Sequence, residues 1–248
     1  MISALAITYN EEKNVERYIK SLSFADEIII VDSFSTDNTV EIAKQLGADV
    51  VQREFDNFSA QKNYALSLAN HDWITFFDLD EIVTAELANE ITNIVKTAYK
   101  NEAYKVKRNF YFMGKRLKYS GFQTDYVIRL FNKNNCKYNG KLVHEAIETS
   151  SSIKKLKHKV DHYTYKSFDD YNLKLTKYSK LKAEELYAKN VRPNLYHFLF
   201  RPWYRFMHQY VFRLGFLDGK EGFIVSYLIG FMVFKRYIQL WTMYRNIE

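Results

Sequence analysis

Three carboxylates stand within four residues at the end of a strongly apolar run. In "DWITFFDLDE", residues 72–81, the aromatic and β-branched "WITFF" predicts a buried strand, and Asp78, Asp80 and Glu81 follow it. Like charges this close repel one another and need a counter-charge. Asp78 and Asp80 can face one Mg²⁺ or Mn²⁺ ion, which fills its remaining positions with water and phosphate oxygens. The alternative is a solvated turn in which Asp80 caps a helix predicted over residues 83–100.

The sequence lacks the glycine-rich loops that commonly cradle phosphates. No glycine precedes Gly47, and neither GxGxxG nor GxxxxGK[ST] occurs. The sequence therefore lacks the main motif expected of a dinucleotide dehydrogenase or a P-loop ATPase. A nucleotide bound here would be held by carboxylates, a metal ion and other side chains.

Strands and helices alternate from residue 2 to about residue 100, which predicts a parallel sheet with crossover helices. The strands are expected at 2–8, 28–31, 49–55 and 72–80, and the helices at 10–25, 39–48, 58–70 and 83–100. In such sheets ligands bind outside the carboxyl ends of the strands. Polar side chains follow three of these ends, at Thr8 to Glu11, at Asp32 with Ser33, and at Asp78 with Asp80. Their convergence favours a binding site over a solvated turn.

The pattern changes after residue 100. The sequence then predicts a β-hairpin over 103–121 that turns at Met113-Gly114, a strand over 126–133 and a helix over 167–190. From Val191 the chain is rich in aromatic residues and arginine, and Pro193 and Pro202 are expected to interrupt it. We expect an α/β domain over residues 1–166 and a helical, basic and aromatic region over residues 167–248.

The charge is distributed unevenly. Residues 1–100 hold 8 Lys+Arg against 17 Asp+Glu, whereas residues 101–248 hold 28 against 12. The acidic front half argues against nucleic acid as the main partner. The basic rear half fits an anionic surface, such as phospholipid headgroups or a phosphorylated glycan, with ordinary solvated lysines as the alternative.

Other bulk features narrow the class. The single cysteine, Cys136, excludes an internal disulfide framework and a cysteine-based zinc cluster. The first residues lack the basic and apolar stretches of a signal peptide, so none is expected. The longest charge-free stretch of the tail, Gly222 to Phe234, is shorter than the ~18 apolar residues that a spanning helix needs, so no spanning helix is expected either.

Several segments carry a resemblance to a known family. "LAITYNEEKNVERYIKSL", "EIIIVDSFSTDNTVEIA", "FSAQKNYALSLANHDWITFFDLDE", "RLFNK" with "VHEAI", and "GFLDGKEGF" resemble family 2 inverting glycosyltransferases of GT-A fold. The sequence is most similar to the bacterial subgroup of β-1,4-glucosyltransferases that adds glucose to the inner core of lipopolysaccharide. That subgroup usually has a small residue where this chain has Leu79. Little effect is expected, because the middle side chain should point away from the cation.

The resemblance implies roles for the residues around the strand ends. Lys62 and Asn63 would approach the nucleotide, and Asp32 would hydrogen-bond the uracil of a UDP-sugar. Asp80 would hold the metal on the diphosphate, and Asp78 would support the ribose or the metal. The other implied contacts are Thr8, Tyr9 and Glu11 in the nucleotide pocket, His162 at the metal or diphosphate, and Arg129 at a phosphate or paired with an acid of the sheet.

An inverting transfer needs one carboxylate to deprotonate the acceptor hydroxyl. By resemblance Glu145 in "LVHEAI" is the expected base, and Asp125 in "QTDYVIRLF" is its rival. A carboxylate at the start of a helix beside His144 is the structural alternative for Glu145.

The sequence thus predicts a metal-dependent transferase that moves a hexose, glucose from UDP-glucose, onto a lipid-linked or cell-envelope glycan such as the lipopolysaccharide core. The aromatic and basic tail favours docking on an anionic membrane, hence a peripheral position on the cytoplasmic face. A buried helix is the alternative for the tail. The competing functions are a sugar-nucleotide nucleotidyltransferase and an inactive, membrane-docked nucleotide-binding module.

Overall fold

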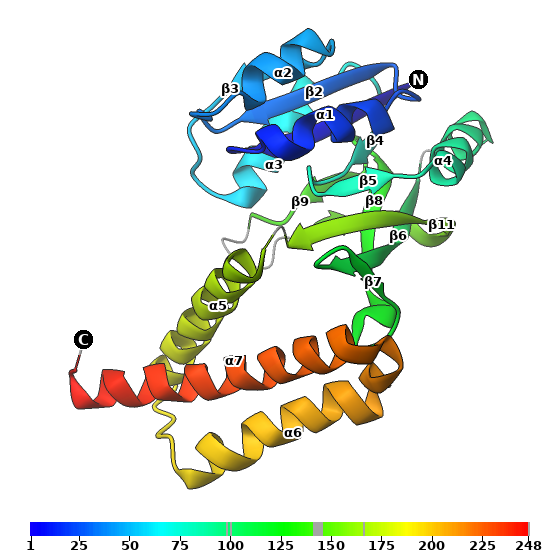
Figure 1. The fold of residues 1–248 in the computed structure, drawn as a ribbon. Helices are drawn as coiled ribbons and strands as arrows, with labels where there is room; N and C mark the ends of the chain where they lie inside the picture. The colour runs from blue at the N-terminus through cyan, green and yellow to red at the C-terminus, as the bar shows by residue number, and fades with distance from the viewer. Residues whose placement is uncertain (98, 100, 141–145, 166, 248) are drawn as a thin grey trace. The chain divides into compact units, whose positions relative to one another are not determined.

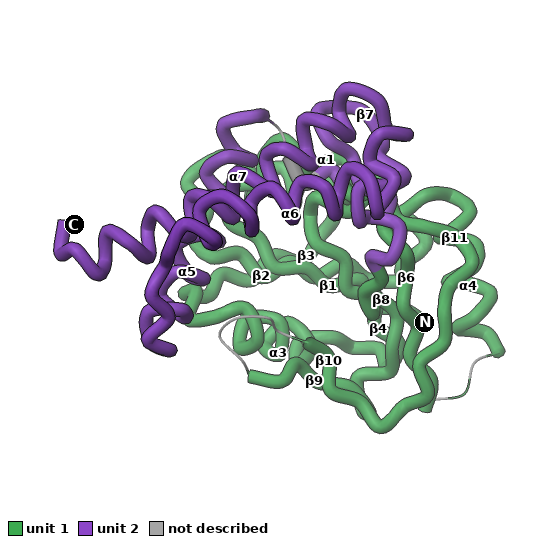
Figure 2. The backbone as a smooth tube through the Cα atoms, turned by 90° about the horizontal axis from the view of Figure 1, so that it is seen from below, with its two compact units in different colours: residues 1–108, 126–162 green, residues 109–125, 163–248 purple. Residues whose placement is uncertain are grey.

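The computed structural model describes residues 1–97, 99, 101–140, 146–165 and 167–247, with Thr164 and Tyr165 described by backbone alone. The chain divides into two compact units (Figure 2). Unit 1 comprises residues 1–108 and 126–162, and unit 2 comprises residues 109–125 and 163–248. Unit 2 includes residues 109–125 of the predicted hairpin, and the expected division into domains at residue 166 stays a prediction.

Unit 1 is an α/β structure whose elements follow the expected alternation (Figure 1). Its helices are α1 (Glu12–Ser21), α2 (Thr39–Gln45), α3 (Phe58–Leu68) and α4 (Ala85–Thr97). Its strands are β1 (Ile2–Thr8), β2 (Glu27–Asp32), β3 (Asp49–Gln52), β4 (Trp73–Phe76), β5 (Glu81–Val83), β8 (Tyr126–Asn132), β9 (Cys136–Tyr138) and β10 (Ile147–Thr149), with β6 (Glu102–Phe112) and β11 (Ser152–Tyr165) continuing into unit 2.

The main sheet has the order β3-β2-β1-β4-β8-β6-β11-β5. The first four strands are parallel, in the registers Leu5 with Ile29 and Leu5 with Phe76, whereas β8 runs antiparallel to β4. β1 and β4 are buried almost throughout, which explains their nearly continuous apolar sequence. The expected mostly parallel α/β fold is therefore confirmed.

The turn after β4 differs from the sequence expectation. Asp80 does not cap the next helix, because the short strand β5 intervenes and pairs antiparallel with β11. Thr84 takes the position before α4, where its carbonyl accepts the N–H of Ala88 and its Oγ1 accepts the N–H of Leu87 at 3.3 Å. The carboxylate of Asp80 is therefore not used as a helix cap and can take part in a binding site.

Unit 2 contains the hairpin end and a helical tail. Met113 and Gly114 both have positive φ, +47° and +81°, as a two-residue hairpin turn requires. The elements of this unit, besides the ends of β6 and β11, are β7 (Lys115–Leu117), η1 (Phe122–Thr124), α5 (Phe168–Ala188), η2 (Tyr196–Phe200), α6 (Arg201–Met207), η3 (His208–Phe212), η4 (Gly215–Asp218) and α7 (Gly219–Arg245).

Pro202 does not interrupt the tail, contrary to expectation. Leu195, Phe200 and Arg201 all have right-handed helical dihedrals, and the π-helical turn η2 leads directly into α6. A proline in a continuous helix removes one hydrogen bond and crowds the preceding turn, and the wider π turn provides room for its ring. The residues from Tyr196 to Phe212 therefore form one continuous rod, which lies beside α7 (Figure 1).

The helix α7 is longer and more apolar than the sequence criterion suggested. Residues Gly215–Arg245 form a segment long and apolar enough to cross a membrane, judged by length and composition alone. The core helix of a soluble protein meets the same criterion, so the expectation that no helix spans a membrane stays a prediction. In the structure 39% of its most apolar stretch is buried, and Val225 and Tyr237 pack with residues of α5.

Candidate functional site

The candidate site lies where the order of the parallel strands reverses. From β1 the chain moves outward to β2 and β3, and then returns to β4 on the other side of β1. Thr8 ends β1, and its Oγ1 is buried without a hydrogen-bond partner among the described residues. The hydroxyl of Tyr18 donates to the carbonyls of Phe77 at 3.0 Å and Leu5 at 3.3 Å, which ties β1 to the end of β4. Buried polar groups are normally hydrogen-bonded, so the unpaired hydroxyl of Thr8 at this rigid strand end favours a ligand site.

A buried ion network explains how three carboxylates stand so close together. Glu81 is fully buried, and Arg129 holds it with Nε 2.7 Å from Oε2 and one terminal nitrogen 2.9 Å from Oε1. Arg108 places a terminal nitrogen 3.4 Å from Oε1. Glu81 Oε2 also accepts the backbone N–H of Asp78 at 3.2 Å. Glu81 therefore anchors the turn that carries the two aspartates, and its charge-assisted hydrogen bonds offset its desolvation.

Asp78 lies between two cations. Arg129 approaches its Oδ2 to 2.5 Å, and Lys62 Nζ is 3.5 Å from its Oδ1. Burial raises the pKa of the Asp78 carboxyl, but the charges of Arg129 and Lys62 lower that pKa more, to well below its usual range. Arg129 is 6% exposed and pairs with acids of the sheet, the second of the two roles that the sequence left open.

Lys62 reaches Asp78 from an aromatic surrounding. Its Nζ lies 5.3 Å from the ring centroid of Tyr138 and 5.7 Å from that of Phe76. These faces favour a cation, and they stabilise a lysine that is only 5% exposed. The predicted position of Lys62 beside the nucleotide is thus also a position beside Asp78.

Asp80 and His162 form the second half of the site. His162 Nε2 is 3.3 Å from Asp80 Oδ2, and β11 brings His162 opposite Glu81. Leu79 belongs to the core of unit 1, so the middle residue of the motif does not occupy the site, as expected. No three His, Cys, Asp or Glu side chains within the described part of the chain converge as a metal site. A carboxylate and an imidazole this close fit a divalent cation that takes its other ligands from a diphosphate and water.

The loops after β1 and β2 are tied together at the same edge. The N–H of Asn10 donates to Ser35 Oγ at 2.8 Å, and the N–H of Thr36 donates to Asn10 Oδ1 at 2.8 Å. Asp32 is fully buried and accepts from the N–H of Ser35 at 2.9 Å and from Gln52 Nε2 at 3.1 Å. These bonds give Asp32 a structural role in the loop, and its contact with uracil stays a prediction.

Of three further residues predicted to contact the nucleotide, one is exposed and two have hydrogen-bond partners within the fold. Tyr9 is 58% exposed. Glu11 accepts from Asn14 Nδ2 at 2.7 Å. The amide of Asn63 pairs with the backbone of Tyr138, donating to its carbonyl at 3.0 Å and accepting its N–H at 2.9 Å. Asn63 therefore joins α3 to β9, whereas Tyr9 is open to a ligand.

The structure describes only one of the two candidates for the catalytic base. Glu145 lies outside the described residues, and Asp125 is a partly exposed residue of unit 2 that follows η1. Sequence reasoning missed Arg108, whose only signal was its place in the alternating strand β6. A surface hollow of about 570 Å³ beside Cys136 and Glu148 contains none of the predicted site residues.

Comparisons with known proteins agree on one family. Residues 3–159 match the model described as glycosyl transferase family 2. An uncharacterized glycosyltransferase of Rickettsia bellii is 30% identical over 96% of this chain and 85% of its own length. The lipopolysaccharide core biosynthesis glycosyltransferase LpsC of Rhizobium meliloti is 26% identical over 95% of this chain and 93% of its own length.

One group of solved structures shares a shorter region. Glucosyl-3-phosphoglycerate synthase from Mycobacterium tuberculosis, solved in complex with Mn²⁺ and UDP, is 28% identical and covers 45% of this chain and 44% of that chain, with a TM-score of 0.38. This likeness is too partial to support conclusions about ligands.

Proposed function

The chain belongs to glycosyl transferase family 2, and we propose that it is an inverting, metal-dependent hexosyltransferase. The donor we propose is UDP-glucose, and the acceptor is a cell-envelope glycan such as the lipopolysaccharide core. The relative named for lipopolysaccharide core biosynthesis supports the acceptor class, because it aligns with nearly the whole chain. Membership of the family speaks against the sugar-nucleotide nucleotidyltransferase, and the intact acids Asp78 and Asp80 speak against an inactive module.

The pair Asp80 and His162 is the observation that carries the donor side of this proposal. The two side chains lie 3.3 Å apart at the strand ends where α/β sheets bind ligands. They would hold the divalent cation, which when bound supplies positive charge against the departing diphosphate. The charges of Lys62 and Arg129 keep the neighbouring Asp78 ionised. Its carboxylate can then accept a hydrogen bond from a ribose hydroxyl or support the cation.

On the acceptor side, inversion requires one in-line displacement with a carboxylate that removes the proton of the acceptor hydroxyl. We assign this base to Glu145, with Asp125 as the rival. Glu145→Gln is expected to keep UDP binding while turnover falls by a factor of about 10² to 10⁴. Single-turnover rates of both Glu145→Gln and Asp125→Asn identify the base, and near-normal turnover in Glu145→Gln would transfer the role to Asp125.

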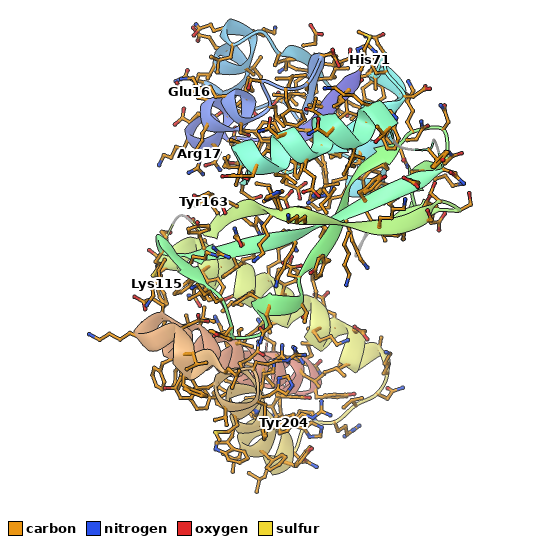
Figure 3. All side chains as sticks on the ribbon, turned by 90° about the vertical axis from the view of Figure 1, so that its right-hand side faces the viewer. Glu16, Arg17, His71, Lys115, Tyr163 and Tyr204 are labelled. Carbon is orange, nitrogen blue, oxygen red and sulfur yellow. The ribbon has the colours of Figure 1, made fainter. Side chains whose placement is uncertain are left out.

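We further propose that unit 2 docks on the cytoplasmic face of the membrane. Phe212 is 69% exposed and Trp203 is 56% exposed, on a rod that also carries Arg201 and Arg205 and that Arg213 directly follows. Figure 3 shows Tyr204 among the crowded side chains of α6. Exposed aromatic rings beside arginine fit the headgroup region of anionic lipid. Such docking would bring the enzyme to a lipid-anchored acceptor.

Calorimetric titration with UDP tests the donor site. Binding is expected with Mn²⁺, and removal of the metal or either substitution, Asp80→Asn or His162→Gln, should weaken it strongly. Glu16→Gln is the control, because Glu16 lies on α1 in an exposed pair with Lys20 (Figure 3). UDP binding that is indifferent to metal and to Asp80 would contradict the proposed metal site. No nucleotide binding under any condition would contradict the proposed function as a whole.

A further inference from the structure

The rod that contains α6 packs antiparallel along α7 within unit 2 (Figure 1). Near one end of the contact, the rings of Phe198 and Phe234 have centroids 6.4 Å apart, and further along, those of Phe206 and Phe223 are 5.7 Å apart. Between them the two helices approach closely, because a Cβ on Gly230 would lie 3.2 Å from Cβ of Phe206. The register between the rod and α7 is therefore fixed by side-chain packing.

This packing gathers three arginines. Arg201 donates from one terminal nitrogen to the hydroxyl of Tyr237 at 2.9 Å. Arg205 lies one helical turn from Arg201 and therefore on the same face of the rod. Arg236 directly precedes Tyr237 on α7. Burial lowers the pKa of the Arg236 guanidinium, and the nearby positive charges of Arg205 and Arg201 lower it further, as expected of three cations held close together.

No carboxylate in the described part of the chain pairs with these arginines. Residues 186–247 contain only two acids, Asp218 and Glu221. Asp218 accepts backbone N–H groups of the hairpin end, and Glu221 Oε2 is 2.6 Å from Lys115 Nζ. Both acids lie at the beginning of α7, and the 15 residues from Glu221 to Arg236 place them about 22 Å apart along the helix.

The cluster therefore concentrates positive charge that the fold does not neutralise. Burial and the charge of Arg213 also lower the pKa of Arg205. The Nε of Arg236 is buried without a hydrogen-bond partner among the described residues. Buried cations without a counter-charge are costly, and such local conflicts are expected where a ligand binds. Arg201 is exposed and the other two arginines are only partly buried, so an anion can reach them.

We propose that Arg201, Arg205 and Arg236 form a binding site for a phosphate monoester. Guanidinium groups bind phosphate oxygens through paired hydrogen bonds. A phosphate monoester carries a charge of about −1.5 to −2 at pH 7, which suits three guanidinium groups better than the single charge of a phosphodiester. The group belongs to a lipid headgroup or to a phosphorylated glycan. The inference rests on the proposed docking of unit 2 only for the lipid source, and it is independent of the donor site.

Arg236→Gln tests the site with inorganic phosphate as the probe. Thermal unfolding is followed as phosphate is added, with sodium chloride of equal ionic strength as the reference. Phosphate should raise the melting temperature of the wild type, because a ligand of the folded state stabilises it. The phosphate concentration that gives the same rise in Arg236→Gln should be about tenfold higher or more, the equivalent of one lost hydrogen bond to a charged group. Without phosphate the variant should be at least as stable as the wild type, whereas a merely structural role of Arg236 would make it less stable.

Arg245→Gln is the matched control. It removes the same charge from the same helix, but Arg245 is exposed at the end of α7, with its guanidinium 5.3 Å from the ring centroid of Trp241. Its response to phosphate should equal that of the wild type. An equal response in all three proteins would overturn the inference. An equal loss in the two variants would also overturn it, because net charge and not the cluster would then attract the phosphate.

Vesicles distinguish the two sources of the phosphate group. Phosphatidic acid presents a monoester and phosphatidylglycerol a diester, so the two lipids are compared in vesicles of equal surface charge. A preference for phosphatidic acid that disappears in Arg236→Gln supports the site and assigns it to a lipid headgroup. A phosphate response without this preference supports the site and assigns it to a phosphorylated glycan. A wild type that binds neither kind of vesicle contradicts the docking of unit 2, while the phosphate titration still decides the inference.

Discussion

Glu81 is the side chain on which the geometry of the acids depends. It is fully buried and receives Arg129, Arg108 and the backbone N–H of Asp78. Glu81→Gln removes the negative charge and leaves the buried guanidinium group of Arg129 and the partly exposed one of Arg108 partly uncompensated. The free energy of unfolding should fall by about 3–5 kcal/mol. Urea denaturation measures this loss, with the exposed Glu16→Gln as control; a Glu81→Gln midpoint equal to that of the control would contradict the anchoring role.

Asp78 makes stability depend on pH at the acid end. Its pKa is lowered in the folded state, because the charges of Arg129 and Lys62 outweigh the effect of burial. A lowered carboxyl pKa stabilises the fold above the unfolded pKa of about 3.9, and this contribution is lost as the pH falls toward the folded value. Asp78→Asn should therefore be less stable than the wild type at pH near 6, and the difference should shrink below pH of about 4. Urea denaturation across this range tests the prediction, and a difference independent of pH would contradict it.

The acids could be found from the sequence, but which residue neutralises each of them could not. Asp78, Asp80 and Glu81 are neighbours in the chain, so their mutual repulsion is visible in the sequence itself. Their counter-charges come from positions 27 and 48 residues beyond Glu81, at Arg108 and Arg129. No local pattern connects such positions, because the sheet order brings them together. Sequence reasoning therefore predicted a metal site and left open that Arg129 pairs with an acid of the sheet, but it did not identify Glu81 and Asp78 as the acids that Arg129 contacts.

At the scale of elements, local periodicity was sufficient to predict the helices and strands whose apolar residues recur with a clear spacing. The alternation of strands and helices from β1 to α4 could be predicted because apolar spacing and the end of α2 near Gly47 are local signals. The short strand β5 was missed because its partner β11 begins about 70 residues later in the chain. The continuous rod through Pro202 was missed because a π turn has no sequence signal as strong as proline.

The junction of η4 and α7 depends on glycines without room for a side chain. A Cβ on Gly222 would lie 2.0 Å from the carbonyl oxygen of Gly215 and 2.7 Å from Cβ of Asp218. The carboxylate of Asp218 in turn accepts the backbone N–H groups of Lys118 and Tyr119, each at 2.9 Å. This junction therefore holds the hairpin end against the tail within unit 2.

Gly222→Ala is expected to destabilise the protein by about 3 kcal/mol or more, because backbone atoms must shift to admit the methyl group. Gly230→Ala in the same helix is the matched control. Its nearest contact is the Pro202 carbonyl at 3.0 Å, and a gain in helix propensity of about 1 kcal/mol offsets the crowding. Thermal unfolding of the two variants measures the difference. Equal melting temperatures would show that the junction is not tightly packed.

At the scale of the molecule, α7 has one face packed within unit 2 and one exposed face. One side packs with α5 through Leu175, Ala183, Val225 and Tyr237. On the other side large apolar residues such as Tyr227 and Phe231 are exposed. Removal of the chain after Asn190 would uncover the first surface and unfold the unit, so truncation cannot test membrane docking. Substitutions confined to exposed rings can.

Trp203→Ala combined with Phe212→Ala removes two exposed rings without touching the core of unit 2. Binding to vesicles of phosphatidylcholine and phosphatidylglycerol in equal amounts should weaken by about tenfold or more, because each ring buries apolar area in the interface. Wild-type binding should also weaken as salt is raised, since the arginines attract the anionic headgroups through screened charges.

Ile153→Ala is the control for this experiment, because Ile153 is an exposed apolar residue of unit 1. It should leave vesicle binding unchanged, and UDP affinity should be the same in all three proteins. Equal vesicle binding by the wild type and the double variant would exclude the rod from Tyr196 to Phe212 as the docking surface. Loss of binding together with salt sensitivity would instead assign to unit 2 the recognition of the surface that carries the acceptor, while unit 1 retains the donor site.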